Sequence, residues 1–545
     1  MSDSGSEGSG FEPQQGHKKQ TFTMAHRHIR ASILAGLWLA IALPCFALTP
    51  YRTEDADTWS RSELSDFTGD TLLLQDDWYI TDNYNFSYGL YSLSPRRIFA
   101  PTNQAEPSTD YYYALLRHNA QGSVSLWGEN DYHRCGERLH NARVRVQEDG
   151  SLLLIDGIWH SNSRADILQG YDTTVLDARG QHTLLVCAAN LEYYLVKNVG
   201  QGMGPASEDE HMLQREKVSA ALARIQADIY GLVEVERGSY ALAEIAQDLT
   251  EKTGRAYSYI GDNVSVYGTY TKSGYVYCTE TVRPGIGPRL NNQGVQYRKY
   301  MQCFEEIASG ESFILSINHF KAKSGNGNGG NSDQDDGQGS YNADRVAEAQ
   351  SVLEEYNYFS TFTSEPDLLV MGDLNAYGKE EPIRRLTDGG LTDLHRLFHA
   401  DSSYTYRYYD GTVGYLDHAL ANRPMLEQVT GMLSYHINSD EHDCFTYDSR
   451  CNDGTMFRYS DHDPVLVGLR LRPELARRTE VDTQHRIHNA QGGYLRIYST
   501  EGWLEAEAPV TSDLFDIPVN GLRCGVHLLH LYYNGTVLYR KILVP

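Results

Sequence analysis

The sequence predicts an α/β fold for its central part, between two β-rich segments. Between residues 182 and 471, short apolar runs alternate with helical patterns that have one apolar face, as in layered α/β domains. Residues 48–180 and 473–545 show strand patterns without long helical ones. With 545 residues, the chain is long enough for about two to four domains. We predict an N-terminal extension with a signal peptide (1–47), a β-rich domain (48–180), an α/β domain (181–472) and a small C-terminal β sandwich (473–545).

The composition is that of an acidic chain rich in tyrosine. The formal net charge is −25, and 39 tyrosines stand against 15 phenylalanines. This many tyrosines suit β-sheet surfaces that are half buried and half wet. An acidic surface repels nucleic acid, so the charge alone favours a protein that does not bind it. A nucleic-acid function would require divalent cations and a local basic patch.

The N-terminus has the pattern of an export signal. Residues 1–23 are too polar to form a core, and the basic Arg27 and Arg30 precede an apolar run over residues 31–43. The run is short for a membrane span, and residues 44–47 resemble a cleavage site. A lipid anchor on Cys45 fits less well, because a proline precedes it. We therefore expect a secreted or cell-surface protein.

Seven cysteines follow the signal, and export would allow them to pair. Cys444 and Cys451 close a short loop and are the best candidate pair. Cys278 and Cys303 lie on two runs that could be neighbouring strands, and Cys524 is the candidate for an unpaired thiol. The chain has no Cys-x-x-Cys pattern, which argues against a structural zinc site built from cysteines.

Residues 48–180 predict a small β domain. Residues 71–75 and 77–80 are strand-like, and residues 143–147 and 151–155 form a predicted hairpin in which Asp149-Gly150 supplies two positive-φ positions. We interpret the domain as structural. The alternative is a nucleic-acid-binding barrel whose exposed rings stack on bases. The candidate rings are Tyr84, Phe86, Tyr88 and Tyr91.

Polar residues in the central segment repeatedly follow or precede apolar strands. Helices are predicted around residues 218–225, 242–249 and 346–356, between these strands. Side chains at the ends of buried strands sit on a rigid scaffold, which favours a functional site. The strand-end residues are Asn190, Glu234, His319, Asp373, Asn375, Asp417, His418, Asp461 and His462.

This set of side chains suits the hydrolysis of a phosphodiester. The reaction needs a divalent cation held by carboxylates, a base to activate water and an acid to protonate the leaving oxygen. Taken alone, Glu234 would be an ordinary solvated loop residue and His319 a structural histidine. Asn190 and Asn375 alone would be turn or cap residues. The hypothesis of phosphodiester hydrolysis therefore rests on the occurrence of all these residues within one predicted domain.

Four motifs in this segment resemble the endonuclease/exonuclease/phosphatase superfamily, and within it the bacterial secreted extracellular nucleases. They are NHFKAK at residues 318–323, GDLNAY at 372–377, GYLDHAL at 414–420 and RYSDHDPV at 458–465. The resemblance covers about residues 182–471. It implies a four-layer α/β sandwich, made of two mixed sheets with helices outside, that hydrolyses phosphoesters.

The resemblance also implies roles for single residues. Mg²⁺, with Mn²⁺ as an alternative, would be bound by Glu234, Asn190 and Asp461. His462 would activate water or stabilise the transition state, oriented by Asp417, and His319 would be the partner acid or a phosphate ligand. Water and phosphate would be positioned by Asp373 and Asn375. A basic lip would be formed by Arg298, Lys321, Lys323 and Arg345.

Two further segments suggest ligands or partners. Residues 331–337 are rich in Asp and Asn and hint at a structural Ca²⁺ site, although they lack the glycine and distal glutamate of an EF-hand. The tail, with residues 525–529 and 540–545, resembles the C-terminal sorting domain of type IX secretion substrates and implies that secretion machinery as a partner. A β module that only packs or binds glycan is the alternative.

These observations predict a secreted, Mg²⁺-dependent nuclease that cleaves DNA, with RNA as a further candidate substrate. A phosphatase or lipid phosphodiesterase of the same fold is one alternative, because the fold does not decide the substrate. A non-catalytic surface binding protein is the alternative from another class. The intact series from Asn190 to His462 favours an enzyme.

Overall fold

The chain divides into two units, residues 1–47 and 48–545, and the second is described here. The predicted signal peptide and Arg298 lie outside the described residues. The computed structural model describes residues 49–51, 64–110, 112, 124–128, 131–169, 173–262, 264–266, 270–291, 299–363, 365–448, 451, 453–472, 480–481, 485–512, 514–533 and 536–544.

The first central sheet has six strands in the order β20-β21-β7-β8-β10-β9. Its strands β7 and β8 are parallel, whereas β21 and β10 pair antiparallel with them, so the sheet is mixed. The bounds are β20 Val429–Ser434, β21 Val465–Leu469, β7 Leu184–Tyr194, β8 Ile229–Glu236, β10 Thr271–Cys278 and β9 Tyr257–Tyr259.

The second central sheet follows the order β11-β13-β14-β15-β19-β16, and β12 pairs with β13 beside this path. Here β14 and β15 are parallel and their outer neighbours antiparallel, so this sheet is also mixed. The bounds are β11 Val282–Pro284, β12 Arg289–Asn291, β13 Lys299–Glu306, β14 Ser312–His319, β15 Leu368–Asp373, β19 Asp417–Asn422 and β16 Leu391–Asp393.

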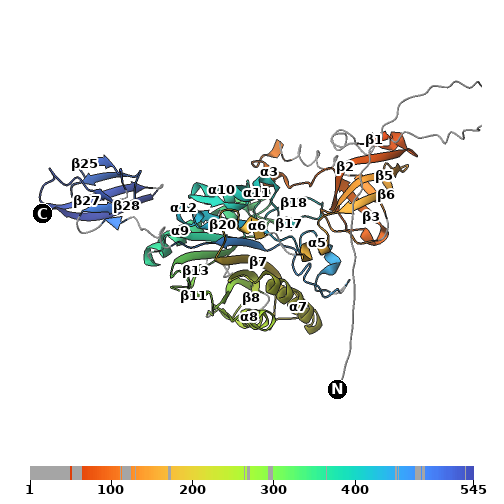
Figure 1. Cartoon of the computed structure of the whole chain (residues 1–545), viewed down its shortest axis with the longest axis horizontal. Coiled ribbons are helices and arrows are strands. Elements are labelled where there is room, and N and C mark those ends of the chain that lie inside the picture. Colours follow the sequence, from red (N-terminus) through yellow and green to blue (C-terminus); the bar gives the residue numbers. More distant parts are fainter. Residues whose placement is uncertain are drawn as a thin grey trace, which may run out of the picture. The chain divides into compact units, whose positions relative to one another are not determined.

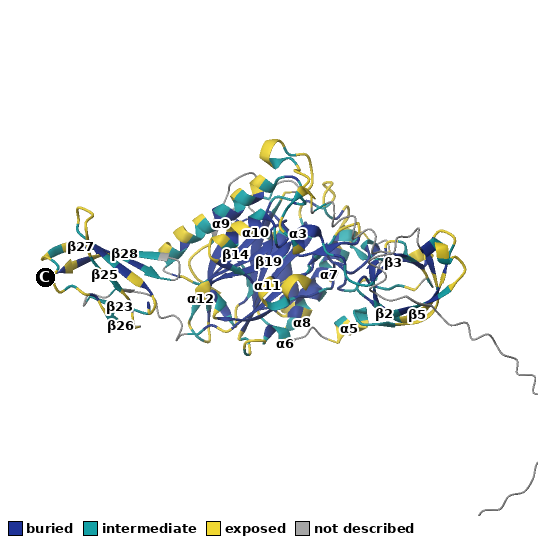
Figure 2. Ribbon diagram, turned by 90° about the horizontal axis from the view of Figure 1, so that it is seen from above, coloured by how far each residue is buried: buried dark blue, intermediate teal, exposed yellow. Residues whose placement is uncertain are grey.

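The two sheets pack face to face, with helices on their outer faces. The core between them joins Val186 and Val233 of the first sheet to Leu315 and Met371 of the second. Helices α7 (Glu208–Ile225) and α8 (Tyr240–Thr253) cover the first sheet, and α9 (Asn342–Thr363) and α10 (Glu381–Asp388) cover the second (Figure 1). The strands of this centre are coloured as buried in Figure 2. The predicted four-layer sandwich is confirmed.

A closed barrel precedes this sandwich. Strands β2, β3, β4, β6 and β5 pair in this order, and β5 returns to β2, while β1 extends the edge of β2. Closure removes the free strand edges, and side chains such as Trp78 and Leu139 fill the interior. The bounds are β1 Thr49–Tyr51, β2 Thr71–Asp82, β3 Leu90–Ser94, β4 Val124–Trp127, β5 Arg138–Val146 and β6 Leu152–His160.

The barrel corrects two local predictions. The two strands expected at 71–75 and 77–80 are one strand, β2, whose register shifts between Leu74 and Asp77. The predicted hairpin is β5–β6, but only Gly150 of its turn has a positive φ, at 76°. Asp149 instead accepts hydrogen bonds from the backbone and side chain of Ser151, because the loop is longer than a two-residue turn.

The structure confirms one of the two predicted cysteine pairs. Cys444 and Cys451 form a disulfide, which confirms the predicted pair. Cys278 and Cys303 are free and buried, and they lie on β10 and β13 of different sheets, so the expectation of neighbouring strands is wrong. Both cysteines lie on strands, but between residues 278 and 303 the chain passes from the first central sheet to the second. Cys524 is exposed.

A third group of strands follows the sandwich. A sheet in the order β25-β24-β27-β28 and a sheet of β22, β23 and β26 share a core that includes Ile487, Leu495 and Leu529. This is the predicted C-terminal β region. The bounds are β22 Glu480–Val481, β23 Arg486–His488, β24 Tyr494–Tyr498, β25 Leu504–Pro509, β26 Leu514–Asp516, β27 Gly525–Tyr533 and β28 Thr536–Val544.

Short elements complete the described part of the chain. They are α3 Pro101–Gln104, α5 Arg164–Leu168, α6 Thr173–Leu176, α11 Leu394–His399, α12 Arg423–Leu426, β17 Tyr406–Arg407 and β18 Val413–Gly414. Among the helices of the described residues, none is both long and apolar enough to span a membrane.

Buried ion pairs join the barrel side of the chain to a loop of the sandwich. Glu441 is fully buried and pairs with Arg134 at 2.5 Å and with Arg164 at 2.6 Å. Asp440, also fully buried, pairs with Arg97 at 2.6 Å. Burial alone would raise the pKa of Asp440, but the charges of Arg97 and Arg134 lower it to about 2. The acidic loop therefore depends on cations supplied from far upstream.

We predict that Glu441→Gln lowers the free energy of unfolding by about 3–5 kcal/mol, because the buried guanidinium of Arg134 loses its counter-charge, whereas Arg164 keeps Asp453. Chemical denaturation of the full chain measures this change. Asp156→Asn is the control, because Asp156 forms an exposed ion pair with Arg143 on the barrel surface, and we expect no measurable change there. Equal losses in both variants would contradict the role of burial.

Candidate active site

Three of the predicted residues form one row across the second sheet. His319 at the end of β14 is paired in register with Asp373 of β15, and Asp373 is paired with Asp417 of β19. The row depends on Gly372, whose φ is 116° and whose absent Cβ would lie 2.1 Å from the carbonyl oxygen of Asn318. A larger residue there would push β14 and β15 apart.

The first sheet contributes Asn190 and Glu234 to the same place. The Asn190 side-chain amide donates to Asp373 Oδ2 at 3.1 Å and to Glu234 Oε1 at 3.4 Å. The backbone N–H of Tyr193 donates to Glu234 Oε2. Glu234 has a left-handed φ of 59°, a conformation that non-glycine residues rarely adopt and that is often found at functional sites. The two sheets therefore meet at one cluster.

Asp373 lies at the centre of this cluster. Its side chain is almost fully buried, and burial raises its pKa to about 7 against the opposing influence of His462. The backbone N–H of Asn375 donates to Asp373 Oδ1, and the Asn375 amide donates to Asp373 Oδ2 and to the carbonyl of Phe320. The amide group of Asn375 is thus committed to holding Asp373 and its loop in place.

Two imidazoles face Asp373 from different sides. His319 Nε2 lies 3.7 Å and His462 Nε2 lies 3.9 Å from Asp373 Oδ2. His319 Nε2 is also 3.5 Å from Glu234 Oε1. These separations are long for direct hydrogen bonds. They leave room for a small ligand or ion among the side chains.

His462 is oriented from behind by a carboxylate. Its Nδ1 lies 2.7 Å from Asp417 Oδ2, which also accepts a hydrogen bond from Thr405 Oγ1 at 2.8 Å. Burial would lower the pKa of His462, but Asp417 and Asp461 hold it well above its usual value. Asp461 itself is about one-third exposed, with Oδ1 3.9 Å from His462 Nε2, and so lies towards the rim.

The donor set fits a divalent cation. Glu234, His319 and Asp373 form one group of potential ligands, and Asp373, Asp417 and His462 form a second. Carboxylate and amide oxygens suit Mg²⁺ or Mn²⁺, and an imidazole widens the choice to other first-row metals. The predicted residues Asn190, Glu234, His319, Asp373, Asn375, Asp417, Asp461 and His462 are all brought to this region.

Sequence reasoning missed Glu192. Its Oε2 atom is buried without a hydrogen-bond partner, and its φ of 50° turns the end of β7 towards the site. Burial and the negative charge of Asp461 raise the pKa of Glu192 to about 8. The one available signal was an acidic residue near the end of a mostly apolar strand, two positions after Asn190.

The predicted basic lip is wrong for two of its four residues, Arg345 and Lys323, while Arg298 lies outside the described residues. Arg345 is fully buried and donates to the carbonyl oxygens of residues 321, 338 and 340, so its guanidinium anchors a loop and forms no exposed lip. Lys323 is paired with the buried Glu380 at 2.5 Å, and burial lowers its pKa to about 8. The ammonium of Lys321 lies 4.2 Å from the centre of the Tyr341 ring, and its side chain is half-buried.

The predicted Ca²⁺ loop gains no support. Asp336 accepts hydrogen bonds from the backbone and side chain of Gln338, and Asp333 accepts one from the backbone of Asp335. Among the described residues, these acidic side chains do not gather into a group of three potential ligands. They stabilise the turns of their own loop instead.

Residues 198–462 match the model of the Endonuclease/Exonuclease/phosphatase family. No curated protein matches the chain. Similar solved structures include an endonuclease/exonuclease/phosphatase from Bacteroides vulgatus, with 16% identity and a TM-score of 0.37 over 53% of this chain and 99% of that one. The human Nocturnin catalytic domain with bound sulfate has 18% identity and a TM-score of 0.35 over 53% of this chain and 94% of that one.

A mannosyl-6-phosphatase from Bacteroides thetaiotaomicron has 16% identity and a TM-score of 0.35, over 53% of this chain and all of that one. The family match includes Glu234, His319, Asp373 and His462, and it covers most of the sandwich and none of the barrel. The match covers slightly less than half of the chain, so the likeness to the Endonuclease/Exonuclease/phosphatase family applies to residues 198–462.

Proposed function

We propose that this protein is a divalent-metal-dependent phosphodiesterase and that its substrate is DNA. The observation that carries the proposal is the convergence of His319 and His462 on Asp373, with Nε2 atoms 3.7 and 3.9 Å from one carboxylate oxygen. The family match of residues 198–462 supports a phosphoester hydrolase. The choice of DNA rests on the sequence resemblance to secreted nucleases.

The carboxylate of Glu234 would hold the metal ion, with the amide of Asn190 beside it and Asp461 at the rim. A bound Mg²⁺ offsets negative charge on the phosphoryl oxygens. His319 Nε2 lies 3.5 Å from Glu234 Oε1, so it faces the same space and can bind a phosphate oxygen or protonate the leaving oxygen. The two sheets thus present a proton donor and an acidic ligand to one position.

His462 is arranged to exchange a proton through Nε2. The close contact of its Nδ1 with Asp417 keeps a proton on Nδ1 and fixes the orientation of the ring. Nε2 then faces the substrate or water, next to Asp373. Asn375 acts as a positioning residue in this scheme, because its amide holds Asp373.

A phosphomonoesterase is the second candidate, and one observation favours it. Of the basic residues expected to bind a polyanion, Arg345 is buried and Lys323 is neutralised by Glu380. The net charge of −25 also repels long nucleic acids, which are polyanions. A non-catalytic binding protein is disfavoured by the assembled site, and DNA retention without turnover under any divalent cation would revive it.

We also propose that the protein is exported, through the signal at residues 24–47 and with the C-terminal sandwich as a type IX secretion signal. The support is the sequence pattern of both ends. Fractionation of cells that produce the full chain, compared with a chain lacking residues 473–545, tests this. Retention of the full chain in the cytoplasm would contradict it.

We expect His319→Ala and His462→Ala each to lower the rate of Mg²⁺-dependent plasmid cleavage by about 10²–10⁴-fold, because each removes a proton-transfer group. EDTA should abolish cleavage by the parent. His182→Ala is the matched control, since His182 pairs with Asp177 at 2.6 Å outside the cluster, and should keep full activity. A fully active His462→Ala variant would refute the assigned site.

Glu234→Gln should raise the Mg²⁺ concentration needed for half-maximal activity by more than about tenfold, because it removes a charged ligand. Activity measured across a Mg²⁺ titration gives this value. Glu251→Gln, at an exposed position on α8, should leave the Mg²⁺ dependence unchanged. An unchanged Mg²⁺ requirement in Glu234→Gln would move the metal site elsewhere.

Lys321→Ala separates the two substrate hypotheses. If DNA is the substrate, the variant should lose DNA cleavage several-fold and show a weaker salt dependence, while hydrolysis of bis(p-nitrophenyl) phosphate stays unchanged. Lys541→Ala, on the C-terminal strand β28, is the control for a general loss of positive charge. Rapid hydrolysis of p-nitrophenyl phosphate by a parent that leaves plasmid intact would favour the phosphomonoesterase.

A further inference from the structure

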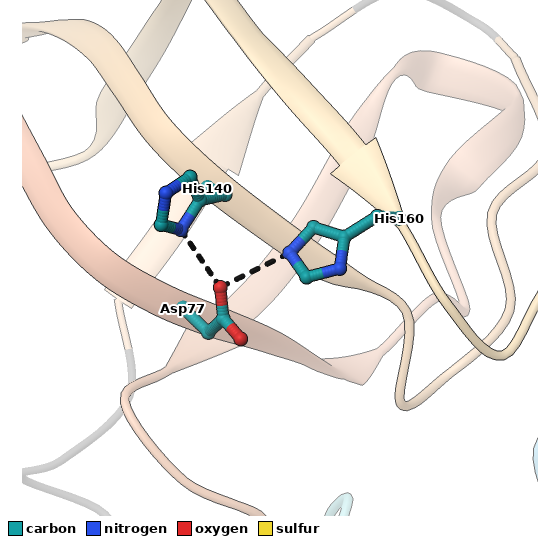
Figure 3. Close-up of side chains that lie close together, drawn as sticks. All are labelled: Asp77, His140 and His160. Atoms are coloured by element: carbon teal, nitrogen blue, oxygen red, sulfur yellow. Dashed lines mark hydrogen bonds and ion pairs between the residues drawn. The ribbon is translucent and has the colours of Figure 1, made fainter.

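A second cluster of ligand-type side chains lies on the outer surface of the barrel, apart from the residues assigned to catalysis. It consists of Asp77, His140 and His160 (Figure 3). His140 Nδ1 lies 2.8 Å and His160 Nε2 lies 3.0 Å from the same oxygen, Asp77 Oδ1. Two imidazoles and a carboxylate therefore converge on one point.

Strand pairing builds this cluster from three strands that are distant in the sequence. Asp77 of β2 is the register partner of His140 on β5, and His160 of β6 is the partner of Arg138 on β5. Arg138 and His140 are two positions apart on β5 and therefore share a face of the sheet. The pairing alone thus brings all four side chains to one face.

The backbone is unusual beside each of the three residues. Asp76, Asn141 and Ser161 have left-handed φ values of 64°, 47° and 55°, and each directly adjoins a member of the cluster. The register shifts next to Asp77 in β2 and after His140 in β5. Such bulges redirect side chains and are frequent next to binding sites. Here the shifts adjoin Asp77 and His140, and His160 is the last residue of β6.

We propose that Asp77, His140 and His160 form a zinc-binding site on the barrel. Zn²⁺ takes imidazole nitrogen and carboxylate oxygen in a tetrahedral arrangement with bonds of about 2.0–2.1 Å, which places ligand atoms roughly 3.3 Å apart. The two nitrogen-to-oxygen distances of 2.8 and 3.0 Å need only a small expansion to admit the ion. The side chains are 27–40% exposed, so water can supply the fourth ligand.

Arg138 holds the carboxylate in the orientation this site needs. Its Nη1 lies 2.8 Å from Asp77 Oδ2, and its Nε donates to Ser161 Oγ at 2.7 Å. The oxygen Oδ2 is thereby occupied, and Oδ1 remains turned towards the two imidazoles. Partners that fix the orientation of a metal ligand in this way are a regular part of metal sites.

The site is independent of the proposed catalytic metal. Its ligands come from β2, β5 and β6, whereas the catalytic cluster draws on strands of the sandwich. A bound ion would link these three barrel strands from the outside. Without the ion, the same groups form a hydrogen-bonded cluster in which the imidazole nitrogens facing Asp77 carry protons, so zinc would replace protons on binding.

Zinc binding to the full chain tests the proposal. Metal-free protein is dialysed against buffered Zn²⁺ at pH 7.5, and bound zinc per chain is measured by atomic emission. We expect the double variant His140→Gln/His160→Gln to bind one ion fewer than the parent. Asp77→Asn, which nearly preserves the shape of the side chain, should weaken that site by more than about tenfold. Plasmid cleavage should be unchanged in both.

The matched control is His527→Gln, because His527 pairs with a single carboxylate, Glu505, at 2.5 Å and offers only one imidazole. It should bind as much zinc as the parent. Cobalt gives a second readout: the parent should show the visible absorption of tetrahedral Co²⁺, and the double variant should lose that part of the spectrum. Equal zinc binding and equal cobalt spectra in the parent and in both variants would overturn the proposal.

Discussion

The register between β14, β15 and β19 is the constraint on which the candidate active site depends. A slip of one residue in any of these strands would turn His319, Asp373 or Asp417 to the opposite face of the sheet. Gly372 secures the register because only a residue without a Cβ fits against the carbonyl of Asn318. The same close packing recurs between the layers, where Gly231 of the first sheet faces Ile317 of the second.

His462 is held in place by a longer chain of contacts. The neighbouring Asp463 is buried and accepts hydrogen bonds from the backbone N–H groups of Asn438 and Ser439. The same loop continues into Asp440 and Glu441, whose charges are balanced by arginines from the N-terminal third of the chain. The barrel region therefore supports the loop behind His462, and it is more than an appended module.

The sequence allowed the layered fold and most of the site to be predicted, because buried strands are apolar runs and the polar residues at their ends stand out. Glu234 and His319 were found in this way. Arg345 was misjudged because whether an arginine reaches solvent depends on the path of a loop, and here that loop folds over it. Glu192, near the end of a mostly apolar strand, and the Asp77 cluster, assembled from three distant strands, gave no contiguous motif.

The buried Arg97–Asp440 pair has a consequence for the order in which the molecule is built. The two residues are separated by 343 positions, so the arginine leaves the ribosome long before its partner exists. Until then its guanidinium remains hydrated, and the loop that supports His462 has not yet been made. Closing so long a segment is a late folding event. The support behind His462 therefore forms only after almost the whole of the central segment has been synthesised.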